Sequence, residues 1–115
     1  MGGPRDEPSR RPPGADALDD DTYPAYAMGA AAAALGVTPA FLRAVETAGL
    51  FEAHRSSGGH RRYSRADLQR ADRARSLVDD GMRMDAAVRI VSLEYQLAAA
   101  TRMIEVLRRR LGEER

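Results

Sequence analysis

The apolar residues in the last third of the chain recur in steps of three and four. This spacing places them on one stripe of a helix that begins near Met84 and continues for three heptads, the minimum that indicates a coiled coil. A lone helix extending from a small domain would leave the stripe in water, so we expect it to pair with the same helix of a second chain. The alternative is that the helix folds back onto its own domain. The residues of this apolar stripe are Ile90, Leu93, Leu97, Ala100, Ile104, Leu107 and Leu111.

Two short helices are predicted in the first half of the chain. Residues 28 to 35 are almost all alanine, which favours a helix and leaves a thin side-chain layer that permits close packing, and Gly36 ends this run. Thr38 then offers an N-cap oxygen and Pro39 a preferred first-turn residue, so a second helix should run from Pro39 to about residue 48. Two short helices joined by so short a turn predict a helix-turn-helix.

The second of these helices has an outward face that suits a DNA groove. A helix that enters the major groove needs small and basic residues near its N-terminus, because bulk would keep its backbone away from the bases. Arg43 is therefore the candidate for reading a base edge, with Thr38 and Ala40 beside it. The alternative is a surface arginine paired with Glu46 one turn later. The expected inward positions are Phe41, Leu42 and Val45.

Residues 55 to 64 predict a β-hairpin that carries cationic side chains. The glycine pair Gly58-Gly59 can take the positive φ angles of a tight turn, so the flanking residues can run antiparallel. Tyr63 supplies an aromatic body to pack against the domain and a hydroxyl to bond outward. Arginines on an exposed ribbon suit contact with phosphate, and the alternative is a solvated hairpin with no ligand. The cationic or potentially cationic residues are Arg55, His60, Arg61 and Arg62.

A third helix is predicted directly after the hairpin. Ser64 and Asp67 have the spacing of a capping box, and Gly81 supplies a stop after about residue 80. Several arginines are distributed around this helix, where they either extend a DNA-facing surface or form an ordinary solvated face. These arginines are Arg65, Arg70, Arg73 and Arg75.

Charge is distributed unevenly along the 115 residues, although the net charge is only +1. Residues 1 to 22 hold three arginines and six acids, whereas residues 53 to 75 hold seven arginines and two aspartates. The first segment is rich in glycine, proline and aspartate with little to bury, which predicts a disordered tail. The length allows one small domain, predicted over residues 23 to 82, and a helical dimerisation region over residues 83 to 115.

Composition excludes several classes of function. There is no cysteine or lysine, and the two histidines, His54 and His60, show no metal-ligand spacing, so we expect neither a metal nor a cofactor. No catalytic constellation or phosphate-cradling glycine motif is visible, so we do not expect an enzyme. The most apolar run, residues 27 to 37, is far shorter than the roughly 20 residues of a membrane span, and the N-terminus lacks a secretory signal. We therefore expect a cytoplasmic protein without membrane contact.

Six segments of the chain share one known pattern: Tyr26-Ala27-Met28-Gly29, Leu35-Gly36-Val37-Thr38, Leu42-Arg43, Glu46, Gly49-Leu50 and Gly59-His60-Arg61-Arg62-Tyr63-Ser64. In this order and without a gap, they resemble the winged helix-turn-helix of MerR-family transcription regulators. The resemblance covers about residues 25 to 92, and the wing segment is its specific part. It implies a mainly α fold, with a small β-hairpin wing and a long C-terminal dimerisation helix.

The resemblance also implies a function. It predicts a bacterial homodimer that places the second helix of each subunit in the major groove of double-stranded DNA, with the wings on the flanking backbone and an antiparallel pair of C-terminal helices between the subunits. By this resemblance Arg43 reads or supports base contacts, and Arg61, Arg62 and Tyr63 grip phosphate. Arg55 and His60 are lesser members of the same set.

The chain departs from the family pattern in places. Ala44-Val45 stands where family members commonly carry aromatics, which removes a possible phosphate-contacting hydroxyl. There is no cysteine-bearing loop or added ligand domain, so metal or drug sensing is not expected. The Leu- and Arg-rich ending is similar to the heat-shock repressor branch, which adds a chaperone co-regulator to the candidate partners beside RNA polymerase. The alternative function is an interaction adaptor, in which the heptad helix binds a different protein and DNA affinity is low.

Overall fold

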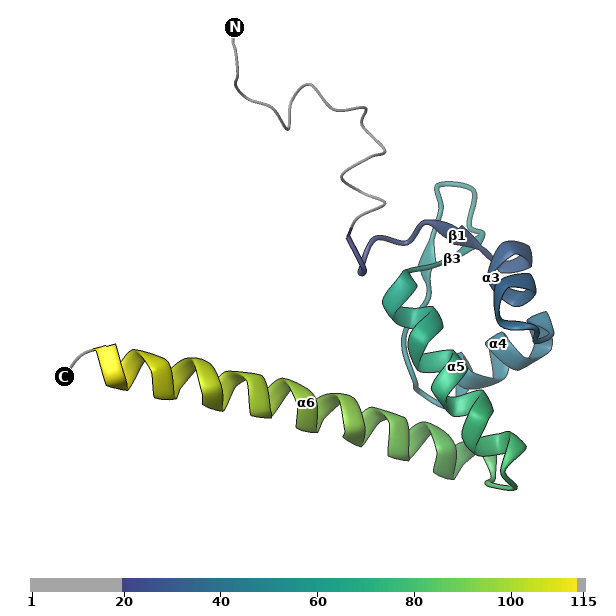
Figure 1. Ribbon diagram of the computed structural model, residues 1–115. Helices are drawn as coiled ribbons and strands as arrows, with labels where there is room; N and C mark the ends of the chain where they lie inside the picture. Colours follow the sequence, from purple (N-terminus) through teal and green to yellow (C-terminus); the bar gives the residue numbers. More distant parts are fainter. Residues whose placement is uncertain (1–19, 114–115) are drawn as a thin grey trace, which may run out of the picture.

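The computed structural model describes residues 20–113, which form a small head and one long helix that projects from it (Figure 1). The predicted class, mainly helical with a hairpin wing and a long C-terminal helix, is confirmed. Residues 1–19 and 114–115, including most of the predicted tail, lie outside the described part. In chain order the elements are β1 (Tyr26–Ala27), α3 (Met28–Leu35), α4 (Pro39–Thr47), β2 (His54–Arg55), β3 (Arg61–Tyr63), α5 (Arg65–Asp79) and α6 (Met84–Glu113).

The helix-turn-helix forms as its end signals predict. Gly36 ends α3 in the left-handed conformation, with φ 69°, which glycine adopts without a steric penalty. The Thr38 side chain then accepts a hydrogen bond of 3.1 Å from the N–H of Phe41, and this contact starts α4. Of the three predicted inward positions of α4, Leu42 and Val45 are fully buried, and Phe41 is partly buried against the same core.

A three-stranded antiparallel sheet lies beside these helices, in the order β1-β3-β2. The central strand pairs Arg62 with Ala27 on one side and with His54 on the other. The β1 strand was not predicted, because two residues are too few to show an alternating pattern. Its pairing ties the wing to the residues that open α3.

The wing turn uses only one residue of the glycine pair in the left-handed region. Gly59 has φ 84°, and its N–H donates to the Ser56 carbonyl at 2.9 Å. The Ser56 N–H donates in turn to the His60 carbonyl at 2.8 Å. This pattern is typical of a three-residue hairpin loop that ends in a left-handed glycine.

Helix α5 begins with the predicted capping box. The Asp67 N–H donates to the Ser64 side chain and the Ser64 N–H donates to the Asp67 carboxylate, both at 3.0 Å. After α5, Gly81 turns the chain with φ 104° and α6 begins. Val88 and Val91 on α6 belong to the buried core of the head, so the helix leaves the head later than the predicted boundary at residue 83.

The described part of the chain begins before the predicted start of the domain. The Thr22 N–H and hydroxyl both donate to the Asp20 carboxylate, at 2.9 and 2.8 Å, and these bonds lower the pKa of Asp20, the backbone bond most. The Asp21 carbonyl accepts a hydrogen bond of 2.8 Å from the N–H of Ala66, in the first turn of α5. Residues 20–22 therefore form a turn that is attached to the head, which differs from the expected disorder at these positions.

No single helix in residues 20–113 is long and apolar enough to span a membrane, and α3 and α4 reach that length and composition only together, as a pair bent by 100°. Within the same residues, no group of three or more His, Cys, Asp or Glu side chains is placed to hold a metal ion.

Candidate nucleic-acid interface

The outward face of α4 is open to solvent. Thr38, Ala40 and Arg43 are all exposed, as the predicted groove-facing surface requires. Arg43 makes no hydrogen bond or ion pair with any other residue between 20 and 113, and the alternative pairing with Glu46 is wrong, because Glu46 binds Arg61 instead. The guanidinium of Arg43 is therefore available to an external partner.

Arg61 connects the wing to α4. Its Nε donates to Oε1 of Glu46 at 2.7 Å, and the two side chains are only 28% and 17% exposed. This hydrogen bond is the largest cause of the raised pKa of Arg61. The pair also compensates a negative charge on α4 that would otherwise repel phosphate. Arg61 thus positions the wing relative to α4, a role that its place in the sequence did not predict.

Tyr63 lies in the core and not on the predicted phosphate-contacting surface. The sequence predicted a hydroxyl that bonds outward to phosphate, but the residue is fully buried and its hydroxyl donates to the Met28 sulfur at 3.6 Å. Its ring packs edge-on against Phe51, with centroids 5.8 Å apart at an angle of 77°. Burial is the largest cause of the raised pKa of Tyr63. The aromatic body packs as predicted, whereas the hydroxyl is inaccessible because the side chain points from the central strand into the core.

The remaining wing residues surround a hollow of about 390 Å³ next to the start of α3. Arg55 donates from Nη1 to the Gly59 carbonyl at 3.2 Å, which braces the loop, and His60 is exposed. The Arg62 side chain makes no ion pair within the described residues. The structure thus brings together all four cationic residues that the sequence singled out in the hairpin. The hollow is lined by Ala27, Met28, Gly29, Arg55, Gly59, His60, Arg61 and Arg62.

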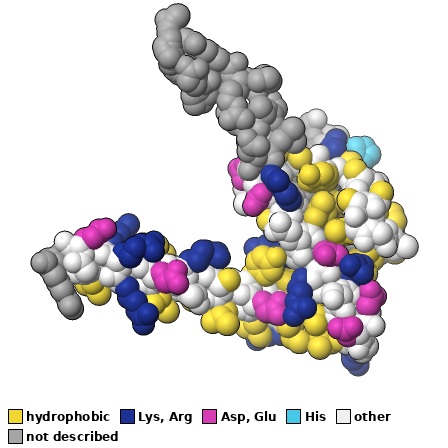
Figure 2. Space-filling model, in the orientation of Figure 1, with side chains coloured by type: hydrophobic (Ala, Val, Ile, Leu, Met, Phe, Trp, Pro, Cys, Tyr) yellow, Lys and Arg dark blue, Asp and Glu magenta, His cyan; other side chains and the backbone are white. Residues whose placement is uncertain are grey.

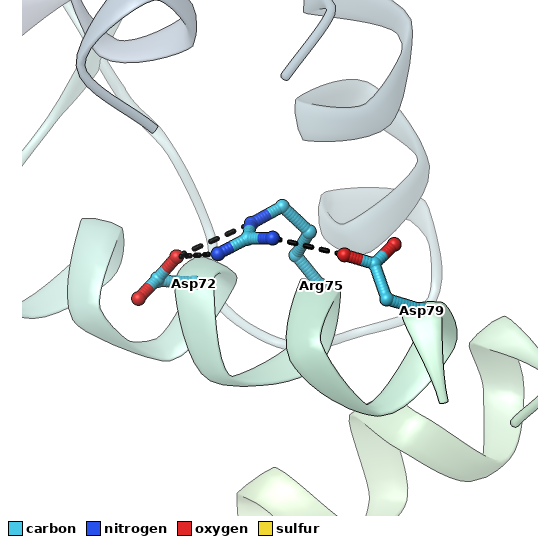
Figure 3. Close-up of polar contacts among 3 residues, drawn as sticks. All are labelled: Asp72, Arg75 and Asp79. Atoms are coloured by element: carbon cyan, nitrogen blue, oxygen red, sulfur yellow. Dashed lines mark hydrogen bonds and ion pairs between the residues drawn. The ribbon is translucent and has the colours of Figure 1, made fainter. Parts of the chain in front are cut away.

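Two arginines of α5, Arg73 and Arg75, differ from Arg62 of the wing because acidic side chains of the protein pair with them. Arg75 lies between two acids of its own helix, 2.7 Å from Asp72 and 2.9 Å from Asp79 (Figure 3). Arg73 pairs with Glu94 on α6 at 2.8 Å. The hydrogen bonds to Asp72 and Glu94 are the largest causes of the raised pKa values of Arg75 and Arg73. Of the two expectations for this helix, the structure favours a paired surface over an extension of the DNA-facing one.

The apolar stripe remains exposed beyond the head. Figure 2 shows hydrophobic side chains between arginines along the projecting part of α6. Leu97 is 69% exposed and Leu111 is 59% exposed, although leucine is usually buried. Ala100 is also exposed, whereas Ile90, nearest the head, is partly buried. The other exposed members are Leu93, Ile104 and Leu107.

The family follows from a direct match. Residues 26–94, more than half of the chain, match the family described as MerR HTH family regulatory protein. The chain belongs to the MerR family. The predicted resemblance is therefore confirmed, and residues 26–94 of this chain carry the winged helix-turn-helix of a family described as regulatory proteins.

Individual relatives agree with this assignment. The chain is 35% identical over 82 residues to a protein of Streptomyces coelicolor named putative heat shock protein HspR, a match that covers 70% of this chain and 54% of the relative. The MerR-family chain thus spans about half the length of that relative. Its fold is similar to HiNmlR, a MerR family regulator lacking the sensor domain that was crystallised bound to promoter DNA. That similarity has a TM-score of 0.50 and 22% identity, and it covers 76% of this chain and 87% of the other.

Proposed function

We propose that the protein is a homodimer that binds specific DNA sequences, with α4 of each protomer in the major groove and the wing on the flanking phosphates. The observation that carries this proposal is the position of Arg43, which is exposed and lacks an acidic partner among residues 20–113. It lies about one helical turn after Ala40, whose small side chain lets the helix approach the bases closely. The cations around the wing hollow support a second contact with the duplex. Phosphate contacts supply affinity and base contacts supply specificity.

Selection from a pool of randomised duplexes at low salt tests this function. We expect enrichment of an inverted repeat, because a symmetric dimer presents two identical α4 helices. Binding of the enriched sequence should weaken steeply as salt rises, since arginine–phosphate contacts release counterions. A pool from which no sequence is enriched would contradict the proposal.

We also propose that the apolar stripe of α6 pairs with the same stripe of a second copy and forms the dimer interface. The exposed leucines support it, because a long stripe of this kind is unfavourable in water. Sedimentation should give a dimer for the natural protein and a monomer for Leu97→Asp. Ala98→Asp is the matched control, since it adds the same charge at the neighbouring exposed position outside the stripe and should remain dimeric. A natural protein that is monomeric at micromolar concentration would favour the adaptor function instead.

A role in the heat-shock response is supported by the name of the Streptomyces relative and by the Leu- and Arg-rich ending of this chain. Under this proposal the regulator acts in the bacterial cytoplasm with a chaperone as co-regulator, and it influences RNA polymerase at its promoters. Binding to the selected operator should strengthen when purified heat-shock chaperones are added. Unchanged operator affinity with every chaperone would remove this part of the proposal.

A further inference from the structure

Two polar contacts join α5 to α6 where α6 leaves the head. Arg73 donates to both carboxylate oxygens of Glu94, from Nε at 3.0 Å and from Nη2 at 2.8 Å. One turn earlier on α5, the guanidinium carbon of Arg70 lies 4.7 Å from the ring centre of Tyr95. Both contacts are directional, because a bidentate pair and a cation–π contact each favour one relative orientation of the groups. We call these two contacts the α5–α6 joint.

The joint lies beside an apolar core that α5 and α6 share. Ala71 and Ala74 on α5 share one buried cluster with Val88 and Val91 on α6. Alanines allow close approach of two helices but present shallow ridges, so they resist sliding and rotation less than large interlocking side chains do. Leu68 of α5 belongs to the same cluster and adds to this packing. The two directional contacts add a preference for one angle between the helices, which apolar packing alone does not supply.

A small change of this angle becomes a large displacement at the far end of α6. From Tyr95 to Glu113 the helix extends about 27 Å at roughly 1.5 Å per residue, and none of the residues in that stretch is buried. A rotation of about 10° at the joint moves the end of such a rod by about 5 Å, which exceeds the rise of about 3.4 Å per base pair of DNA. In a dimer joined through α6, the same rotation changes the distance between the two α4 helices.

We propose that the Arg73–Glu94 and Arg70–Tyr95 contacts are positioning contacts that select the spacing between the two DNA half-sites. The inference rests on the proposed homodimeric DNA binding and assigns spacing selectivity to residues that do not contact DNA. Weakening the joint should widen the range of spacings that the dimer accepts. Binding of one protomer to one half-site should stay the same, because α4 and the wing lie on other elements.

Helix α5 also offers a matched control. Arg75 has a side-chain exposure of 34%, against 45% for Arg73, and its two acidic partners lie within α5 (Figure 3). Arg73→Gln and Arg75→Gln therefore remove the same charge from the same helix, but only the first loosens the contact with α6. The pair Arg73→Glu with Glu94→Arg reverses the joint without changing the net charge.

The experiment measures binding of the full chain to the selected operator and to versions with one or two base pairs added to or removed from the centre. The natural protein should prefer one spacing. We compare the affinity for the preferred spacing with the affinity for spacings one or two base pairs away. For Arg73→Gln and Glu94→Gln, this ratio of affinities should fall roughly threefold to fivefold, the size expected for one exposed ion pair. Arg75→Gln should keep the natural ratio, and the reversed pair should recover it. For the second contact, Tyr95→Leu should lower the ratio and Tyr95→Phe should retain it.

Two readouts separate the possible failures. Sedimentation and affinity for a single half-site should be unchanged in all variants, and circular dichroism should show the natural helix content. Suppose that an operator is enriched and that affinity depends on spacing in the same way for Arg73→Gln, Glu94→Gln and the natural protein. This result would overturn the inference about the joint and leave the proposed function intact. A selection without any enriched operator would overturn the proposed function and the inference with it.

Discussion

The proposed DNA-facing surface and α5 both carry arginines, but two arginines of the first differ from two of the second in their neighbours. Arg43 and Arg62 have no acidic partner among residues 20–113, whereas Arg73 and Arg75 lie 2.8 and 2.7 Å from carboxylates. A guanidinium that already binds a carboxylate must give up that contact before it can bind phosphate. A dense run of arginines therefore identifies a basic segment, while the placement of acids decides which arginines are available.

The largest expected effect comes from removing the unpaired arginine on α4. Arg43→Ala should weaken binding to the selected operator by about 1 to 3 kcal/mol and relax the preference at one base pair of each half-site. Binding to random DNA should change less, because the phosphate contacts remain. Titration of both duplexes by fluorescence anisotropy measures this difference. Equal losses on specific and random DNA would mean that Arg43 contacts only the backbone.

Much of the fold could be predicted because its signals are local. Thr38 and Ser64 cap helices within three residues of themselves, and the hairpin glycine acts within its own turn. The ion pair between Arg61 and Glu46 could not be predicted in this way, because it joins residues 15 positions apart on different elements. The outward face of α4 followed from helical periodicity, but the partner of each arginine depends on tertiary packing.

The second prediction compares an unpaired wing arginine with a paired arginine of α5. Arg62→Ala should weaken binding to all sequences and reduce the slope of log affinity against log salt by about 0.9 for each lost phosphate contact, or about 1.8 for the two wings of the dimer. Arg75→Ala removes the same charge but should leave the slope almost unchanged, because Asp72 and Asp79 already neutralise that side chain. Salt titrations of both variants provide the measurement. Equal slope changes would show that net charge matters and pairing does not.

The third prediction concerns Arg61, a wing arginine that is already paired with Glu46. Arg61→Gln should reduce the slope of log affinity against log salt by less than Arg62→Ala does, because the main contact of Arg61 is with Glu46. It should also lower the midpoint of thermal unfolding, since the half-buried carboxylate of Glu46 loses its partner. The double variant Arg61→Gln with Glu46→Gln should recover part of that loss. A full salt-slope effect with unchanged unfolding would instead place Arg61 among the phosphate contacts.

The smallest expected effect is a pH dependence of stability at the α5–α6 joint. Arg73 lowers the pKa of Glu94 below its ordinary value of 4.5, chiefly through the side-chain hydrogen bond. Because the folded pKa is the lower one, the pair stabilises the fold fully above pH 4.5, and this contribution is lost as the pH falls through the folded pKa.

The free energy of unfolding should therefore be slightly higher for the natural protein than for Glu94→Gln at neutral pH, and the difference should shrink as the solution is acidified. Urea unfolding at fixed protein concentration measures it, since dimerisation makes stability depend on concentration. An Arg43→Ala variant serves as the comparison, because an arginine without an acidic partner should give no such pH-dependent difference. The difference in free energy of unfolding between the natural protein and Glu94→Gln could also persist unchanged well below pH 4. In that case the contribution would come from packing of the side chain, and charge pairing with Arg73 would not explain it.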